Sequence, residues 1–202
     1  AKLDELKLAE STLLVFTSDN GGLVHRTPWG VVTNNAPFRS GKGSLYEGGI
    51  RVPLLIRCPG MTKAGSTSDV PVSTQDLFPT ILSAIGCAEK EIGKVDGANL
   101  LPLLRDPKAQ LERDALFWHY PHYYPTTTPV TAMRSGHYKL LHFYEGDRVE
   151  LYDLKTDPGE RTSLTKTKPE VVKKLRARLK TWIGYVNARL PTPRPGKSGK
   201  SR

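Results

Sequence analysis

A short, uninterrupted apolar run is the feature that most constrains the fold of this chain. Leu13-Leu-Val-Phe-Thr17 follows a segment, residues 1–10, that has the apolar spacing of a helix. A helix followed by a continuous apolar strand is typical of a parallel sheet that is buried on both faces. A second run, Val52-Pro-Leu-Leu-Ile-Arg57, predicts a second buried strand. We therefore expect an α/β domain over residues 1–110.

Helical patterns complete this first part. Residues 74–85 have an apolar stripe along one helix face, with Ser73 or Thr74 as the N-cap and Gly86 as the end. A turn and a short helix are expected over residues 96–104. The opening helix has no residue before it that could serve as an N-cap. The chain is therefore expected to begin inside an element, as a fragment of a longer protein would.

The sequence pattern changes near residue 112. Four short runs separated by Gly, Pro and Asp predict an antiparallel sheet, over residues 115–120, 131–134, 137–143 and 149–154. A final helix is expected over residues 169–190 and should pack on that sheet. Residues 111–190 are thus predicted to form an α+β subdomain, and the Pro-, Gly- and Lys-rich residues 191–202 a disordered basic tail.

The charge balance restricts the choice of partners. The formal net charge is +10, from 30 basic and 20 acidic residues, which favours polyanions. No nucleic-acid-binding motif occurs, and much of the excess lies in residues 173–180 and 194–202, which we interpret as a solvated helix face and a tail. No apolar run is long enough to cross a membrane. Neither a nucleic acid nor a membrane is an expected partner, and the state of Cys58 and Cys87 is left open.

Asp19 and Asn20 follow directly after the first apolar run. Ligands bind at the carboxyl end of strands in open α/β sheets. A carboxylate beside an amide, followed by two glycines, offers the oxygen ligands that hard cations prefer. An ordinary strand-to-loop turn has the same composition, and two ligands do not complete a coordination shell.

The run Gly41-Lys42-Gly43 lies in the long loop between the two predicted strands. Flanking glycines let the backbone approach a ligand closely, while the lysine ammonium supplies a point charge. This arrangement suits an oxyanion such as sulfate or phosphate, although the spacing is not that of a Walker loop. Glu47 and Arg51 are expected to form a structural pair that fixes the loop.

Four further residues are candidates for substrate binding. His25 lies just past Asn20, and Arg39 lies in the same run as Lys42. His119 and His122 belong to an aromatic segment that would suit the lining of a sugar pocket. A plain loop histidine at position 25, and aromatic packing between domains at 119 and 122, are the alternatives.

Together these motifs closely resemble the type I sulfatases (arylsulfatases), C-terminal half, of the alkaline-phosphatase-like superfamily. The resemblance spans nearly the whole chain in order, through Ser18-Asp-Asn-Gly-Gly22, Asn35-Ala-Pro-Phe-Arg-Ser-Gly-Lys-Gly-Ser-Leu-Tyr-Glu-Gly-Gly-Ile-Arg-Val-Pro53, Ser73-Thr-Gln-Asp-Leu-Phe-Pro-Thr-Ile-Leu82, Asp114-Ala-Leu-Phe-Trp-His-Tyr-Pro121, Ala132-Met-Arg-Ser-Gly-His-Tyr-Lys-Leu140 and Glu150-Leu-Tyr-Asp-Leu-Lys-Thr-Asp-Pro-Gly-Glu160. It implies that residues 1–110 are the C-terminal portion of a mixed-sheet catalytic domain, followed by a small antiparallel sheet with a packed C-terminal helix.

The resemblance also implies roles for three residues. Asp19 and Asn20 would bind the divalent cation, calcium with magnesium as the alternative, and Asp19 would lie next to the nucleophile. Lys42 would bind the sulfate group. The family's nucleophile is a formylglycine made in a Cys/Ser-x-Pro/Ala-x-Arg motif, which neither cysteine here matches. It is therefore expected in a missing N-terminal half, and the isolated chain is expected to be inactive.

The expected function is that of a sulfuric ester hydrolase acting on a sulfate ester, with a sulfated glycan as one candidate. Because sulfatases mostly work outside the cytoplasm, the parent protein is expected in a bacterial periplasm or secreted. Two alternatives stay open: a phosphatase or phosphonate hydrolase of the same superfamily, and a non-catalytic module that binds sulfated glycans through its positive charge.

Overall fold

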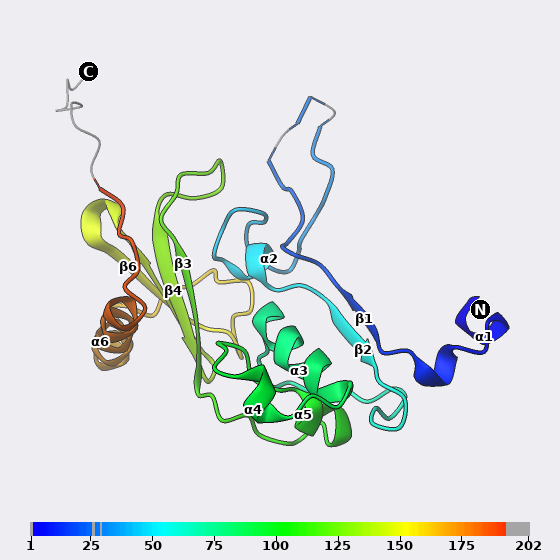
Figure 1. Cartoon of the computed structure of the whole chain (residues 1–202). Helices are drawn as coiled ribbons and strands as arrows, with labels where there is room; N and C mark the ends of the chain where they lie inside the picture. Colours follow the sequence, from blue (N-terminus) through cyan, green and yellow to red (C-terminus); the bar gives the residue numbers. More distant parts are fainter. Residues whose placement is uncertain (1, 26, 29, 193–202) are drawn as a thin grey trace. The chain divides into compact units, whose positions relative to one another are not determined.

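The computed structural model of the chain describes residues 2–25, 27–28 and 30–192 and divides into two compact units. Unit 1 contains the described residues up to Asn20 together with Arg51–Leu116. Unit 2 contains the described residues of Gly21–Ile50 and those from Phe117 onward. The long loop that carries Lys42 thus belongs to unit 2, whereas the two strands that it connects belong to unit 1 (Figure 1). The units are therefore not consecutive in sequence, unlike the domains expected above.

The two predicted apolar strands are present in unit 1, but the expected parallel, fully buried arrangement is wrong for them. Strand β1 (Leu14–Thr17) pairs antiparallel with β2 (Leu54–Arg57). Alternate side chains are exposed, among them Phe16 at 61% and Leu55 at 60%. An apolar run does not reveal the direction of its partner strand, and the segment between these two strands reverses the chain.

The opening helix is much shorter than predicted. Helix α1 (Lys2–Glu5) stops, and a separate 3-10 turn, η1 (Ala9–Ser11), follows it. Lys7 adopts a left-handed φ of 57°, and the amide of Leu8 donates to the carbonyl of Leu3 at 2.8 Å, a helix-ending arrangement. Leu6 and Leu8, which follow this helix, are about half exposed.

The helix predicted over residues 74–85 is confirmed, with Ser73 as its N-cap. A 3-10 turn, η2 (Thr74–Asp76), leads into α3 (Leu77–Ala84). The short α4 (Glu89–Ile92), which the sequence pattern did not predict, and the expected α5 (Leu101–Arg105) complete unit 1. Cys58 and Cys87 are both free thiols.

Asp76 is the polar centre of unit 1. Its carboxylate is completely buried and accepts both guanidinium branches of Arg113, at 2.6 and 2.7 Å. It also accepts the amides of Ser73 and Ala98, at 2.7 and 2.8 Å. One side chain therefore caps the helix and ties it to two later segments of the unit.

The predicted antiparallel sheet and C-terminal helix of unit 2 are confirmed. The strand order is β3-β4-β5-β6, and β5 pairs antiparallel with both β4 and β6. The elements are β3 (Ala115–Tyr120, whose first two residues belong to unit 1), β4 (Val130–Ser135), β5 (Tyr138–Phe143), η3 (Glu145–Asp147), β6 (Arg148–Asp153) and α6 (Pro169–Tyr185). Helix α6 lies against the sheet (Figure 1).

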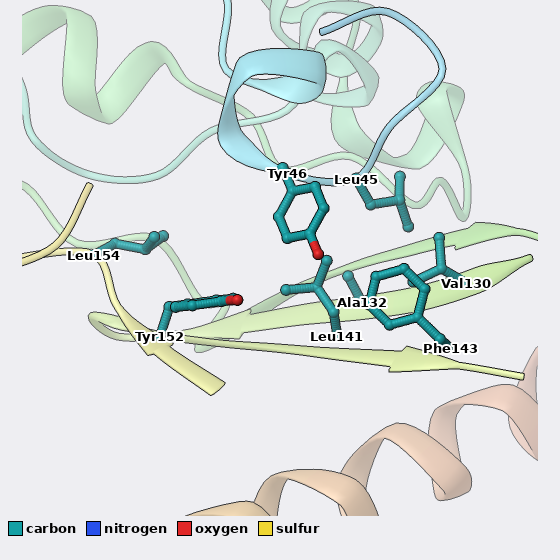
Figure 2. Packing of buried hydrophobic residues seen from close by; sticks show 8 residues of the cluster. All are labelled: Leu45, Tyr46, Val130, Ala132, Leu141, Phe143, Tyr152 and Leu154. Atoms are coloured by element: carbon teal, nitrogen blue, oxygen red, sulfur yellow. The ribbon is translucent and has the colours of Figure 1, made fainter. Parts of the chain in front are cut away.

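The two faces of this sheet have different partners. One face packs against the long loop, in a cluster that contains Leu45 and Tyr46 together with alternate residues of the sheet (Figure 2): Val130, Ala132, Leu141, Phe143 and Tyr152. The opposite face packs against α6, where Phe117 stacks on Trp182 with ring centroids 4.9 Å apart. Successive side chains of a strand therefore pack alternately against the long loop and against α6.

Helix α6 ends at Tyr185, five residues before the predicted end at Leu190. Asn187 adopts a left-handed φ of 48°, and the amide of Ala188 donates to the carbonyl of Ile183 at 3.0 Å. Asparagine tolerates this conformation better than most residues, which explains the stop. The predicted disordered tail lies, from residue 193 on, outside the described residues. None of the described helices has the length and apolar character needed to span a membrane.

Asp76 provides a test of how unit 1 is held together. We expect Asp76→Ala to lower the free energy of unfolding by about 3–5 kcal/mol, the usual cost of leaving one partner of a buried ion pair unpaired. Urea denaturation measures this change. Asp69→Ala, at an exposed position, should shift the value by less than about 0.5 kcal/mol. Equal effects of the two substitutions would contradict the role assigned to Asp76.

Candidate active site

The side chain of Asn35, which lies in the same long segment, holds the Gly-Lys-Gly loop. The Asn35 amide donates to the carbonyls of Gly22 and Ser40, at 2.9 and 3.0 Å, and accepts the amide of Gly22 at 3.0 Å. The amide of Lys42 donates to the carbonyl of Gly22 at 3.0 Å. One amide side chain thus satisfies three backbone groups and closes the loop around residue 42.

The glycines of this segment allow close contact between backbones. Helix α2 (Glu47–Ile50) contains Gly48 and Gly49, and a Cβ on either would overlap backbone oxygens of residues 39–44. Gly43 has a φ of +82°, and a Cβ there would overlap the ring of Tyr124. Glycine is required at these positions because α2 and the Tyr124 ring lie directly against the loop.

The side chain of Lys42 is exposed, and its ammonium has no ion-pair or hydrogen-bond partner in the part of the chain that the structure describes. Its backbone, by contrast, is held at both ends, because its carbonyl accepts the hydroxyl of Thr126 at 2.8 Å. A cation held on a fixed backbone and left without a protein anion is suited to binding an external oxyanion.

His25 contacts Tyr124, the residue whose ring also lies against Gly43 of this loop. The His25 and Tyr124 rings meet edge to face, with centroids 5.8 Å apart. The Nδ1 atom of His25 is buried and has no hydrogen-bond partner among the described residues. The structure thus places His25 and Gly43, the residue after Lys42, against the ring of Tyr124, which the sequence analysis did not single out within its aromatic segment.

The two other histidines are placed differently. His122 is exposed on the loop that contains Tyr124, and its ring meets Tyr120 at 5.3 Å. His119 points to the α6 face of the sheet, where Nε2 donates to the carbonyl of Arg189 at 2.9 Å and Nδ1 accepts from Thr131 at 2.7 Å. Because that face is opposite the one that the Lys42 loop covers, the structure does not bring His119 and Lys42 together.

Arg39 is engaged with the sheet. Its guanidinium stacks on the Tyr46 ring at 3.9 Å and donates to the hydroxyl of Tyr152 at 3.0 Å. Burial raises the pKa of both tyrosines, against the lowering effect of the Arg39 charge. A cavity of about 650 Å³ lies beside Arg39, lined mainly by residues 34–40 and 159–161. Arg39 therefore has structural partners on one side and an open cavity on the other.

In unit 1, Asp19 and Asn20 lie directly after β1. The Asn20 amide group donates to the Asp19 carboxylate, while Oδ1 of Asn20 is buried and has no hydrogen-bond partner among the described residues. An oxygen of this kind beside a carboxylate fits a hard cation. No group of three or more His, Cys, Asp or Glu side chains suited to a metal occurs among the described residues. These two residues would therefore be part of a coordination shell.

Comparisons with known proteins agree on one family. The profile described as N-sulphoglucosamine sulphohydrolase, C-terminal, matches residues 40–184. A sulfatase of Formosa agariphila is 33% identical over 196 residues, covering 90% of this chain and 34% of that protein. Steryl-sulfatase of Mus musculus is 35% identical and covers 82% of this chain and 31% of its own length. The chain thus spans about a third of the length of these relatives.

Solved structures give the same result. The crystal structure of Ps i-CgsB superimposes with a TM-score of 0.74 at 27% identity, over 89% of this chain and 38% of that one. The structure of BT4656 in complex with its substrate, D-glucosamine-2-N,6-O-disulfate, has a TM-score of 0.70 at 29% identity, over 90% of this chain and 36% of that one.

The contact between Gly43 and Tyr124 can be tested with a matched pair of glycines. Gly43 and Gly146 both have positive φ, but only at Gly43 would a Cβ meet another residue. We expect each substitution by alanine to cost about 1–2 kcal/mol of unfolding free energy for its backbone conformation. Gly43→Ala should lose about 1–3 kcal/mol more, because the Tyr124 ring must move. Similar losses in urea denaturation would show that this contact does not constrain the loop.

Proposed function

The chain belongs to the sulfatase family, and we propose that the protein containing it hydrolyses sulfate esters, with Lys42 binding the sulfuryl group. The observation that carries this proposal is the Lys42 ammonium, exposed and unpaired among the described residues on a loop held by Asn35 and Thr126. A positive charge fixed before the substrate arrives requires no reorganisation during the reaction. It would stabilise the negative charge on the sulfuryl oxygens as the ester bond breaks.

Asp19 and Asn20 are proposed to hold a divalent cation, calcium with magnesium as the alternative. The unpartnered Oδ1 of Asn20 supports this proposal, because a buried oxygen with no donor is costly unless a cation satisfies it. When bound, the cation would act as a Lewis acid on the sulfuryl oxygens. The remaining ligands, and a nucleophile expected as formylglycine, would come from outside the residues described. We therefore propose that this chain by itself is inactive.

His25 is proposed to contact the substrate. Its buried Nδ1 has no partner among the described residues, and Tyr124 fixes the plane of the ring from the side. Such a nitrogen can donate to a substrate oxygen when protonated or accept from a hydroxyl when not. His119 is left out of this proposal, since both of its ring nitrogens are already engaged.

We propose a sulfated glycan as the substrate class. Among the similar structures, Ps i-CgsB has been solved in complex with k-i-k-neocarrahexaose, and the substrate of BT4656 is a sulfated glucosamine. The loop beside Lys42 carries His122 and Tyr123, both exposed, and Tyr123 is 68% exposed. Exposed rings on a loop next to an anion-binding lysine suit the flat faces of sugar rings. The net charge of +10 also favours a polyanionic substrate.

Lys42 is the first residue to test. In the full-length protein, Lys42→Ala is expected to lower kcat/KM for an aryl sulfate by about 10²–10³, the usual cost of losing one group that stabilises transition-state charge. Lys155→Ala, at an exposed position outside the loop, should leave it unchanged. Turnover of a phosphate monoester without turnover of an aryl sulfate would instead establish the phosphatase alternative. Salt-sensitive glycan binding with neither activity would establish the binding module.

The cation proposal has its own test. After chelation of the full-length protein, we expect activity to be lost and to return on addition of calcium. Asp19→Ala should raise the calcium concentration needed for half-maximal activity by about 10–100-fold. Substitutions of residues that only support the metal ligands already have effects of this size. Asp69→Ala is the matched control, since its carboxylate is exposed. Full activity in the presence of a strong chelator would contradict the proposed cation site.

A further inference from the structure

We propose that Lys139, buried between Glu47 and Glu160, is a positioning residue that fixes the Gly-Lys-Gly loop and so sets the place of the Lys42 ammonium. This inference rests on the proposed function for the role of Lys42 in binding sulfate. The way in which its loop is held does not depend on that function. The Lys139 Nζ lies 2.8 Å from Oε1 of Glu47 and 2.9 Å from Oε1 of Glu160. The Lys139 and Glu160 side chains are 0% exposed and that of Glu47 is 4% exposed.

These three residues come from three separate segments of unit 2. Lys139 is on β5, on the face that the long loop covers, Glu47 is the first residue of α2, and Glu160 follows β6. Burying three ionisable groups is expensive, and apolar residues of similar volume often give equal or greater stability. A charge cluster in this position therefore contributes mainly to geometry: it selects one placement of α2 on the sheet, since any other would leave a charge unpaired.

Glu160 extends this constraint to both sides of Lys42. Its Oε2 accepts the amide of Glu47 at 2.6 Å, and its carbonyl accepts the Arg39 guanidinium at 3.1 Å. Residues 39 and 47, which flank the loop, are thus bonded to one residue. Burial raises the pKa of Glu160, and the neighbouring Lys139 charge opposes that shift.

The two residues that follow Glu47 in α2 contact the loop directly. The amide of Gly48 donates to the carbonyl of Arg39 at 2.9 Å, and Gly49 lies against the carbonyls of Gly41 and Ser44 with no room for a Cβ. The short α2 therefore forms the support on which residues 39–44 lie. A displacement of Glu47 would move this support, and a shift of about 1 Å at a reacting group can cost on the order of 10²-fold in rate.

The first experiment measures the loop without any enzyme assay. Glu47→Gln preserves the size of the side chain and the backbone amide. It also leaves Lys139 paired with the Glu160 carboxylate, so it should disturb the fold less than Lys139→Met. In the full-length protein, amide hydrogen exchange should become faster at residues 42–49 while the amides of Leu140 and Leu141 on β5 keep their protection. Glu112→Gln, at an exposed position, is the control. Unchanged exchange at 42–49, or uniform loss that includes β5, would overturn the proposal.

The second experiment asks whether the cluster acts through Lys42. Glu47→Gln should lower kcat/KM for an aryl sulfate by about tenfold when Lys42 is present and by less than about twofold in the Lys42→Ala background, because residues that act through one another are not additive. An equal loss in both backgrounds would overturn the positioning role. If the protein proves to have no sulfatase activity, the proposed function fails, whereas the exchange experiment still decides how the loop is held.

Discussion

The structure of unit 2 depends on a sheet that is covered on both faces by unlike partners. Helix α6 covers one face with ordinary apolar packing, through Leu175 and Leu179. The other face is covered by a largely irregular segment between β1 and β2, whose described residues form α2 as their one helix. Such a segment can lie on a sheet only if its backbone groups find other partners. Asn35, the close glycine contacts and the buried charges provide those partners, and the loop that carries Lys42 is fixed as a result.

Regular elements were predictable where local pattern alone determines them. The four sheet strands, the capped helix after Ser73 and the C-terminal helix all follow from periodicity and turn residues. The opening helix and the direction of the β1–β2 pairing do not, because they depend on what the apolar side chains pack against. In the described residues, Phe16, Leu55 and the leucines after α1 have no such cover. A pattern of apolar residues predicts an element, but not the surface that will stabilise it.

Sequence motifs selected the residue types of the candidate site but did not predict the residues around them. Lys42 between two glycines, and Asp19 next to Asn20, are local motifs whose residue types suggest an oxyanion and a cation. Tyr124, which lies against both His25 and Gly43, is far from them in sequence, as Lys139 is from Glu47. Contacts of this kind have no local sequence signal. A lysine in a strand is usually read as exposed, so nothing in the sequence marks Lys139 as buried between two carboxylates.

Two polar atoms of the candidate site, one in each unit, differ from the buried polar groups around them. Nearly every buried polar group near the Lys42 loop has a partner, down to the three bonds of Asn35. Oδ1 of Asn20 and Nδ1 of His25 are buried without one among the described residues. Leaving such an atom unsatisfied costs about 1–3 kcal/mol. This cost is consistent with the proposal that a cation completes the Asn20 site and that a substrate contacts His25.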